Sequence, residues 1–407
     1  MRYWSWFAVF TLFFVGIAPA DTPPNTAFLG GRWFDGERFV ATQFYSVDGT
    51  LTREKPNRID REIDLGDWFV VPPFGEAHNH NIDERPMAER MARRYLQDGI
   101  FYVKIPNNVA EEVPKMEGII NSRRNIDVAF SHGALTAPGG HGIEIAKRNI
   151  DAGRWPARYG EGGFYHTLDS EADLLEKWPR VLVGKPDFIK TYLLYSEEFE
   201  KRREAEAFFG WKGLNPVLLP KIVELAHLDG LRVSTHVETA TDFHHAVNAG
   251  VDEINHLPGF RPQPGVARER YSIAPEDAER AAERDIVVVT TANYARTPDA
   301  REIAKANLVL LKQHGVRLAV GSDRYAATAT MEINYLSRLE IFEPVELLRM
   351  WTETTANTIF PNRRIGRLDE GYEASFLVLE GNPLEDFRNT RSIRIRVKQG
   401  FVLEEPE

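Results

Sequence analysis

Residues 69–81 read FVVPPFGEAHNHN, and this stretch decides how the rest of the chain is interpreted. An apolar run leads into a Pro-Pro break, and His78 and His80 follow with one residue between them. Alternate side chains of an extended strand point to the same face, so a His-x-His pair at a strand end directs both imidazoles to one point. This geometry suits a metal ion, although such a pair also occurs as two ordinary polar residues. Further ligands have to come from elsewhere in the chain.

The composition is that of an ordinary globular protein, and we expect it to act on a small molecule. The 407 residues, 43% hydrophobic and 27% charged, suffice for one large domain and a smaller one. The net charge of −10 is spread along the chain without an acidic block or a basic stripe, which argues against nucleic acid or an anionic membrane as partner. A homo-oligomer is compatible with the sequence. There is no cysteine, so metal ligands must be nitrogen and oxygen donors.

The first 20 residues differ in character from the rest. Arg2 precedes an apolar run over residues 4–17, and Ala18-Pro19-Ala20 fits a small-x-small cleavage site. This pattern predicts a signal peptide over residues 1–20, cleaved after Ala20, and a periplasmic or secreted protein with no membrane attachment after cleavage. An uncleaved anchor is the alternative, but the apolar run is shorter than the ~20 residues of a membrane-spanning helix.

The periodicity of the remaining chain predicts an α/β fold. Residues 26–70 read as short strands separated by Asp-Gly and Gly-Gly turns. From Phe69 short apolar runs alternate with amphipathic ones, as in βαβ units. After the His-x-His strand, strands are predicted at 100–105, 127–130, 187–194, 231–237, 253–257, 286–291 and 317–320. Helices are predicted at 86–97, 109–122, 142–152, 171–182, 216–228, 241–249, 275–283, 299–314 and 344–355.

Eight strands with helices between and after them predict a (β/α)8 TIM barrel over residues 71–360. A second β-rich stretch begins at Ile365. Residues 21–70 and 361–407 are each too short to bury a core alone, so we expect them to pair into one composite small β-sandwich. A doubly wound open sheet is the alternative, but it would need a Gly-rich phosphate turn, and the sequence offers none.

Four more predicted strands carry a polar side chain within them or at their end. Lys190 lies inside the apolar fourth strand, where a free ammonium is costly to bury. The fifth, sixth and eighth strands end on His236, His256 and Asp323. Each residue alone has an ordinary explanation, such as a hydrogen-bonded core histidine, but chemistry in barrels sits at these strand ends. Their joint occurrence favours a metal site.

With these residues the chain resembles the amidohydrolase superfamily of metal-dependent hydrolases. The ending IGRLDEGYEASFLVLEGNPLEDF is similar to that superfamily's return strand, and ALTAPGGHG (134–142) is similar to the imidazolonepropionase and prolidase-like branch. Glu76 departs from the usual aspartate before the histidine pair, and ASFLVL from the usual alanine-aspartate pair. The resemblance implies two divalent ions, with zinc as first choice. It implies that they are held by His78 and His80, by His236 and His256, by a carboxylated Lys190 as bridge, and by Asp323 beside a bridging hydroxide.

The implied reaction is hydrolysis of a C–N amide bond in a dipeptide, an N-acyl amino acid or a cyclic amide. Metal ions activate the hydroxide, and Asp323 passes its proton to the leaving nitrogen. A lactone or ester hydrolase would use the same site, whereas a mononuclear deaminase would typically lack Lys190. A catalytically silent binding barrel is the alternative outside enzymes.

Four residues are predicted to contact substrate. His141 follows Gly139-Gly140 after the third strand, where the backbone can approach a ligand closely. His132, nearer the strand, competes for this role. Tyr192 and Tyr195 lie near the end of the fourth strand, in a region that carries specificity in such barrels.

Overall fold

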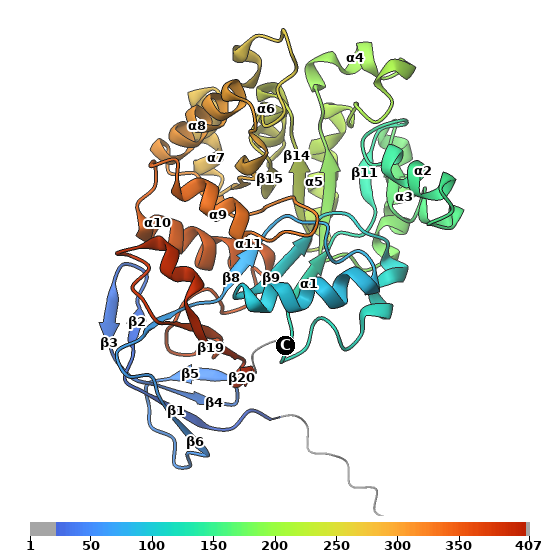
Figure 1. The fold of residues 1–407 in the computed structure, drawn as a ribbon. Helices are drawn as coiled ribbons and strands as arrows, with labels where there is room; N and C mark the ends of the chain where they lie inside the picture. The colour runs from blue at the N-terminus through green and yellow to red at the C-terminus, as the bar shows by residue number, and fades with distance from the viewer. Residues whose placement is uncertain (1–21, 404–407) are drawn as a thin grey trace, which may run out of the picture.

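The structure, a computed structural model, describes residues 22–403 (Figure 1). The predicted signal peptide and its cleavage site lie outside the described residues. No described helix is both long and apolar enough to cross a membrane.

The centre of the molecule is built from parallel strands in two sheets. The first sheet has the order β10-β9-β8 and the second the order β12-β11-β13-β14-β15-β16-β17. Their bounds are β8 (Phe74–Glu76), β9 (Ile100–Ile105), β10 (Asp127–Phe130), β11 (Ala134–Thr136), β12 (Tyr165–Thr167), β13 (Phe188–Tyr192), β14 (Arg232–His236), β15 (Glu253–Asn255), β16 (Val287–Val289) and β17 (Arg317–Ala319). Most of these strands are buried along their whole length, as expected for parallel strands covered on both faces.

Two backbone hydrogen bonds link the two sheets. The amide of Asp187, just before β13, donates to the carbonyl of Phe130 in β10 at 2.8 Å. The amide of Ala77, just after β8, donates to the carbonyl of Val320, just after β17, also at 2.8 Å. The ends of β8 and β17 are therefore neighbours although they are far apart in the sequence.

The seven strands predicted after the His-x-His segment are confirmed, because each predicted range contains one of β9, β10 and β13–β17. The predicted His-x-His strand is in fact two strands, β7 (Phe69–Val71) and β8, separated by Pro72-Pro73. Proline has no amide to donate to a sheet, which explains the interruption. The short strands β11 and β12 were not predicted.

The helices surround the parallel strands (Figure 1). They are α1 (Arg85–Gln97), α2 (Ile143–Asp151), α3 (Glu171–Val183), α4 (Phe199–Arg202), α5 (Leu219–Leu228), α6 (Ala240–Ala249), α7 (Pro275–Glu283), α8 (Pro298–Gln313), α9 (Thr330–Ser337), α10 (Pro344–Arg349) and α11 (Thr355–Ile359), with a π-helical turn at Met350–Thr354 between the last two. The predicted helix at 109–122 is wrong: only a 3-10 turn forms there, Ala110–Met116, and Pro114 lies inside it. Helix α9 was not predicted.

Strands from both ends of the chain share one sheet of the β-rich part. This sheet has the order β20-β19-β18-β7-β2-β3, and β18 pairs with β7 in antiparallel fashion. A second sheet has the order β5-β4-β1-β6. The remaining bounds are β1 (Thr26–Leu29), β2 (Arg32–Phe34), β3 (Phe39–Ala41), β4 (Phe44–Val47), β5 (Thr50–Thr52), β6 (Arg61–Asp64), β18 (Phe376–Leu379), β19 (Ile393–Lys398) and β20 (Phe401–Leu403). A separate hydrophobic core, with Trp33 and Phe376 in contact at 5.1 Å between ring centroids, fills this part.

Candidate metal and catalytic site

All six predicted metal ligands lie in or just after parallel strands. Histidines 78 and 80 follow β8, the lysine lies in β13, and His236 ends β14. His256 directly follows β15, and Asp323 lies four residues beyond the end of β17. The strands therefore bring to one edge residues that are up to 245 positions apart.

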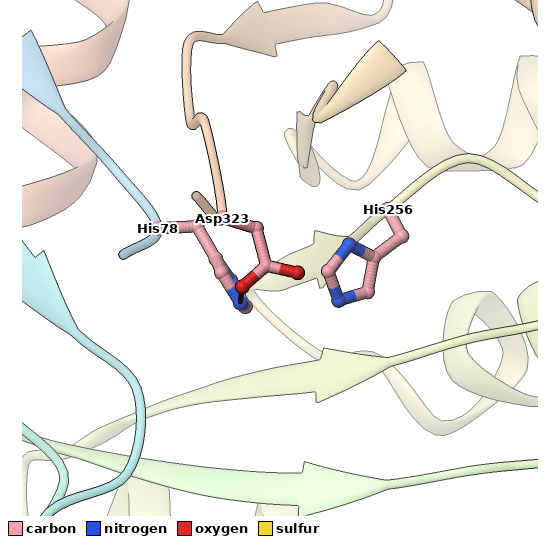
Figure 2. A group of neighbouring side chains, drawn as sticks. All are labelled: His78, His256 and Asp323. Carbon is pink, nitrogen blue, oxygen red and sulfur yellow. Dashed lines mark ion pairs between the residues drawn. The ribbon is translucent and has the colours of Figure 1, made fainter. Parts of the chain in front are cut away.

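Three of these residues converge most closely. One side-chain atom each from His78, His256 and Asp323 lies within 4.8 Å of the other two (Figure 2). The Nε2 atoms of His78 and His80 each lie 3.6 Å from Oδ1 of Asp323. Nitrogen and oxygen donors that meet at such distances can coordinate a divalent cation.

The second pair of histidines adjoins this group. The ring centroids of His236 and His256 are 4.5 Å apart, and those of His78 and His256 are 4.7 Å apart. The tightest group therefore crosses the division implied by the family resemblance, in which His78 belongs to one ion and His256 to the other. The arrangement is one continuous cluster of donors.

The histidines are held in the neutral form. Burial lowers the pKa values of His78, His236 and His256 well below the ordinary value, and it lowers the pKa of His80 to about 4. A neutral imidazole presents a lone pair, which is the form that binds metal. The electrostatics of the cluster thus fit a cation site.

Strained backbone accompanies two of the ligands. His256 has a φ of +74° and Asp323 a φ of +50°, in the left-handed region that is uncommon for residues other than glycine, although aspartate and histidine enter it more often than most. Nδ1 of His256 lies 2.8 Å from Oγ1 of Thr291, which fixes the ring and leaves Nε2 available to a ligand. Strain of this kind costs of order 1–3 kcal/mol per residue and concentrates at functional sites.

Lys190 is buried in the same region, with 1% of its surface exposed. Its Nζ donates a hydrogen bond to Oδ1 of Asn255, whose Nδ2 in turn donates to Oε1 of Glu253 at 2.9 Å. Burial lowers the pKa of Lys190 to about 7, so a large fraction of its amine is unprotonated at neutral pH. The unprotonated amine is the form that can react with carbon dioxide.

Glu76 supports Asp323 through the preceding residue, and from the sequence it stood out only as a departure from the family pattern. Its two carboxyl oxygens accept hydrogen bonds from the amide and the hydroxyl of Ser322, at 2.7 and 2.8 Å. Ser322 directly precedes Asp323, so a fully buried acid at position 76 fixes the loop that carries the ligand.

Two of the four predicted substrate residues border the cluster. The His141 ring lies edge-on to the Tyr192 ring at 4.8 Å and 5.3 Å from the ring of His236. The Tyr192 hydroxyl accepts a hydrogen bond from Nδ2 of Asn107 at 3.0 Å. Both side chains therefore lie beside the cluster.

The other two predicted substrate residues lie elsewhere. His132 lines a separate cavity of about 240 Å³ together with His166, and its ring stacks on Phe130. Tyr195 is 1% exposed and is enclosed by Arg202 and Arg270, whose guanidinium carbons lie 3.9 and 4.9 Å from its ring centroid. The loops after the strands direct both side chains away from the cluster, and the sequence alone does not determine the geometry of these loops. We therefore no longer expect His132 or Tyr195 to contact substrate.

An ion pair between Arg261 and Glu238, beside the histidines, was not predicted from the sequence. Nη2 of Arg261 lies 2.9 Å from Oε1 of Glu238, and the same oxygen lies 3.3 Å from Nε2 of His236. Arg261 also lies over the ring of Phe260, which stacks on His256 at 4.5 Å. The spacing of His236 and Glu238, two residues apart, is the same signal that pointed to His78 and His80 and could have revealed this carboxylate.

Comparison with known proteins agrees with this architecture. A model of the Amidohydrolase family matches residues 205–400. A. niger ochratoxinase superimposes with a TM-score of 0.75 at 18% identity, covering 95% of this chain and 97% of that chain. Molinate hydrolase gives 0.73 at 16% identity, over 94% and 95%. A Xaa-Pro dipeptidase with bound methionine in its active site gives 0.72 at 17% identity, over 93% and 100%.

At these identities the solved structures show a shared fold, which is an α/β fold of the TIM-barrel type with a sheet-rich N-terminal part. No match was found among curated proteins.

Proposed function

The chain belongs to the amidohydrolase superfamily and is a hydrolase of carbon–nitrogen bonds, and from this premise we propose that it cleaves the amide bond of a small substrate at a centre of two divalent ions. One observation carries the proposal: His78, His256 and Asp323 offer three ligand atoms within 4.8 Å, with His80, His236 and Lys190 beside them. A barrel that served only for binding would have no need of this convergence.

The donor set fits zinc, and manganese, cobalt or nickel would accept the same donors. The four histidines and Asp323 would hold the ions, and Lys190 as a carbamate would supply a further oxygen donor to them. Carbamate formation joins the Lys190 amine to carbon dioxide with release of one proton, and it converts a costly buried ammonium into an oxygen donor. The lowered pKa of Lys190 favours that reaction.

Asp323 is proposed as the proton carrier. Divalent ions bound in such a site acidify water and polarise the carbonyl under attack. In the described structure no hydrogen-bond donor occupies the carboxylate of Asp323, and burial raises its pKa to about 6. It can therefore take a proton from the attacking water and release it to the leaving nitrogen near neutral pH.

The rim of the site suits a substrate that carries a carboxylate. His141 and the Tyr192 hydroxyl can donate hydrogen bonds, and the Arg261 side chain is 41% exposed and supplies a positive charge. Ochratoxinase and the Xaa-Pro dipeptidase share the fold, and we infer by analogy a dipeptide or N-acyl amino acid as substrate.

The test combines metal analysis with a chemical rescue. We expect two ions per chain and hydrolysis of some member of a panel of dipeptides, N-acyl amino acids and cyclic amides. Lys190→Ala should lose activity and second-ion binding, and short carboxylic acids should restore part of both. Lys305→Ala, at an exposed lysine of α8, is the matched control and should behave as the wild type. One ion per chain, or full activity of Lys190→Ala without rescue, would contradict the two-ion centre.

We extend the proposal to domain organisation and location. Residues 71–360 form a closed (β/α)8 barrel, residues 21–70 and 361–407 form the composite sandwich, and residues 1–20 direct export to the periplasm or medium. Mass spectrometry of the protein expressed with its own leader should give a mature chain that starts at Asp21. A full-length chain retained in the cytoplasmic fraction would contradict export.

A further inference from the structure

A large groove lined by arginines lies apart from the metal cluster. Its volume is about 1050 Å³, and its lining residues come mainly from α1, the segment that leads into α9, α9 itself and the chain around the start of β19. Five arginines and one aspartate supply its charged side chains: Arg90, Arg93, Arg94, Arg338, Arg391 and Asp98. In a chain of net charge −10 this is a strong local excess of positive charge.

The arginines reach the groove from three different elements. Arg90, Arg93 and Arg94 stand at positions i, i+3 and i+4 of α1, which places them on one helical face about 5–6 Å apart. Arg338 follows the last residue of α9, and Arg391 ends a 3-10 turn before β19. The charges therefore surround the groove and do not form a single row.

Most of this charge is not neutralised by the protein. Asp98 pairs with Arg94 at 3.1 Å and also accepts a hydrogen bond from Thr328, so its carboxylate is already used. Across residues 22–403, no carboxylate lies within ion-pair distance of Arg90, Arg93, Arg338 or Arg391, all of which are exposed. Four unpaired like charges around one concavity repel one another, and a bound anion would relieve that repulsion.

The groove also offers unoccupied polar groups at the start of α9. The residue before this helix is Ala329, which provides no side-chain cap, and the positive end of the helix dipole adds to the arginine field. Thr330, the first residue of α9, lines the groove, so this end of the helix borders it. The helix N-terminus adds to the arginines a preference for an oxygen-rich anion.

We propose that this groove binds a soluble oligoanion of the oligophosphate type, separately from the hydrolytic site. All five cations are arginines, whose planar fork matches phosphate oxygens in a bidentate manner. A groove of about 1050 Å³ with arginines from three elements is larger than one phosphate, which favours several linked groups. The volume is that of a small-molecule site and the surface is concave, which favours a free ligand over a flat membrane.

The groove is separate from the proposed hydrolytic site, but one loop contributes to both. Residues 324–329 join Asp323 to α9, and Ala326 and Ala327 line the groove. Asn81, next to His80, accepts a hydrogen bond from the Ala326 amide at 2.8 Å and donates one to the Ala327 carbonyl at 2.6 Å. The wall of the groove is thereby tied to the segment that carries the histidine pair.

The experiment is isothermal titration calorimetry of the metal-loaded full chain with tripolyphosphate. We expect saturable binding that weakens as sodium chloride is raised, because salt screens exposed charges. Arg93→Gln/Arg338→Gln should weaken binding at least tenfold and leave the melting temperature and metal content unchanged. Arg38→Gln/Arg61→Gln removes the same charge from exposed arginines of the β-rich part and should bind as the wild type.

Three outcomes would overturn the proposal. The first is no binding of tripolyphosphate by the wild type. The second is equal binding by the wild type and Arg93→Gln/Arg338→Gln, which would assign the heat to metal sequestration or to another surface. The third is binding to phosphatidylglycerol vesicles without binding to tripolyphosphate, which would make the face a membrane contact.

Discussion

Glu253 and Asp323 are both carboxylates of the parallel-strand core, the first buried and the second with 19% of its side chain exposed, and their surroundings are opposite. Glu253 in β15 has four donors on its two oxygens: Nζ of Lys104 at 2.9 Å, the hydroxyls of Thr358 and Ser234, and Nδ2 of Asn255. The carboxylate of Asp323 receives no hydrogen bond within the described residues and faces His78 and His80 at 3.6 Å.

The difference is visible in the pKa values. Burial alone would raise the pKa of Glu253, but the Lys104 ammonium and the hydrogen bonds hold it below its ordinary value. Burial raises the pKa of Asp323 to about 6, only partly opposed by Arg261 and Lys190. Burial of a charge therefore does not identify a functional site. An unsatisfied carboxylate among neutral histidines indicates a site, whereas a saturated carboxylate indicates structure.

The sharpest test of this comparison removes the charge at the site. Asp323→Asn should reduce kcat by ~10²–10⁴, because an amide cannot carry the proton between water and leaving group. The free energy of unfolding should change little, since no protein donor is lost. Kinetics on the best substrate and a urea denaturation curve measure both effects. Near-wild-type turnover would remove Asp323 from the proton-transfer role.

The complementary change is made at the structural carboxylate. Glu253→Gln leaves the Lys104 ammonium buried without its counter-charge, and we expect a loss of ~3–5 kcal/mol in the free energy of unfolding. Glu276→Gln, at an exposed glutamate of α7, should cost much less and serves as control. Chemical denaturation of the wild type and both variants measures the free energy of unfolding of each. If Glu253→Gln kept its stability, the Lys104–Glu253 pair would not be a structural element of the core.

The surroundings of Glu76 are intermediate between those of Glu253 and Asp323. Its hydrogen-bond donors are neutral groups of Ser322, and no cation pairs with it within the described residues. Burial raises its pKa from 4.5 to about 8. The folded state then keeps a proton that the unfolded chain releases above pH 4.5, so the stability contributed by neutral Glu76 is present below pH 4.5 and is lost as the pH rises through 8.

Glu76→Gln should therefore flatten the pH dependence of stability between about pH 5 and 8.5. A difference of one pH unit between the folded-state and unfolded-state pKa of a group corresponds to about 1.4 kcal/mol of stability. Urea titrations of wild type and variant over this range measure the effect. Parallel curves for the two proteins would show that Glu76 does not titrate in this window.

The smallest expected effect concerns the rim of the site. His141→Ala should lower kcat/KM by about tenfold, near 1.4 kcal/mol, with metal content unchanged. His132→Ala, in the separate cavity, should leave kcat/KM unchanged and is the natural partner experiment. The reverse result, a loss with His132→Ala only, would restore His132 as the substrate contact.

Much of the fold was predictable from local pattern. Strand and helix periodicity predicted seven of the nine strands from β9 to β17, and the strand ends supplied the six candidate ligands. The structure gathers His78, His256 and Asp323 most closely, with the other three beside them. The prediction of a helix at 109–122 was wrong because Pro114 interrupts the apolar periodicity, and proline is not tolerated in the interior of an α-helix.

The sequence by itself determined which donors the chain possesses and where along the strands they stand, because side-chain chemistry and strand periodicity are local properties. Only the tertiary structure decided how distant residues combine. It turned His132 away from the cluster and His141 toward it, and it satisfied Glu253 with Lys104, 149 positions away. It also gathered arginines from α1, α9 and the chain before β19, although the sequence shows no basic stripe. Such pairings depend on the packing of whole elements, which no local pattern encodes.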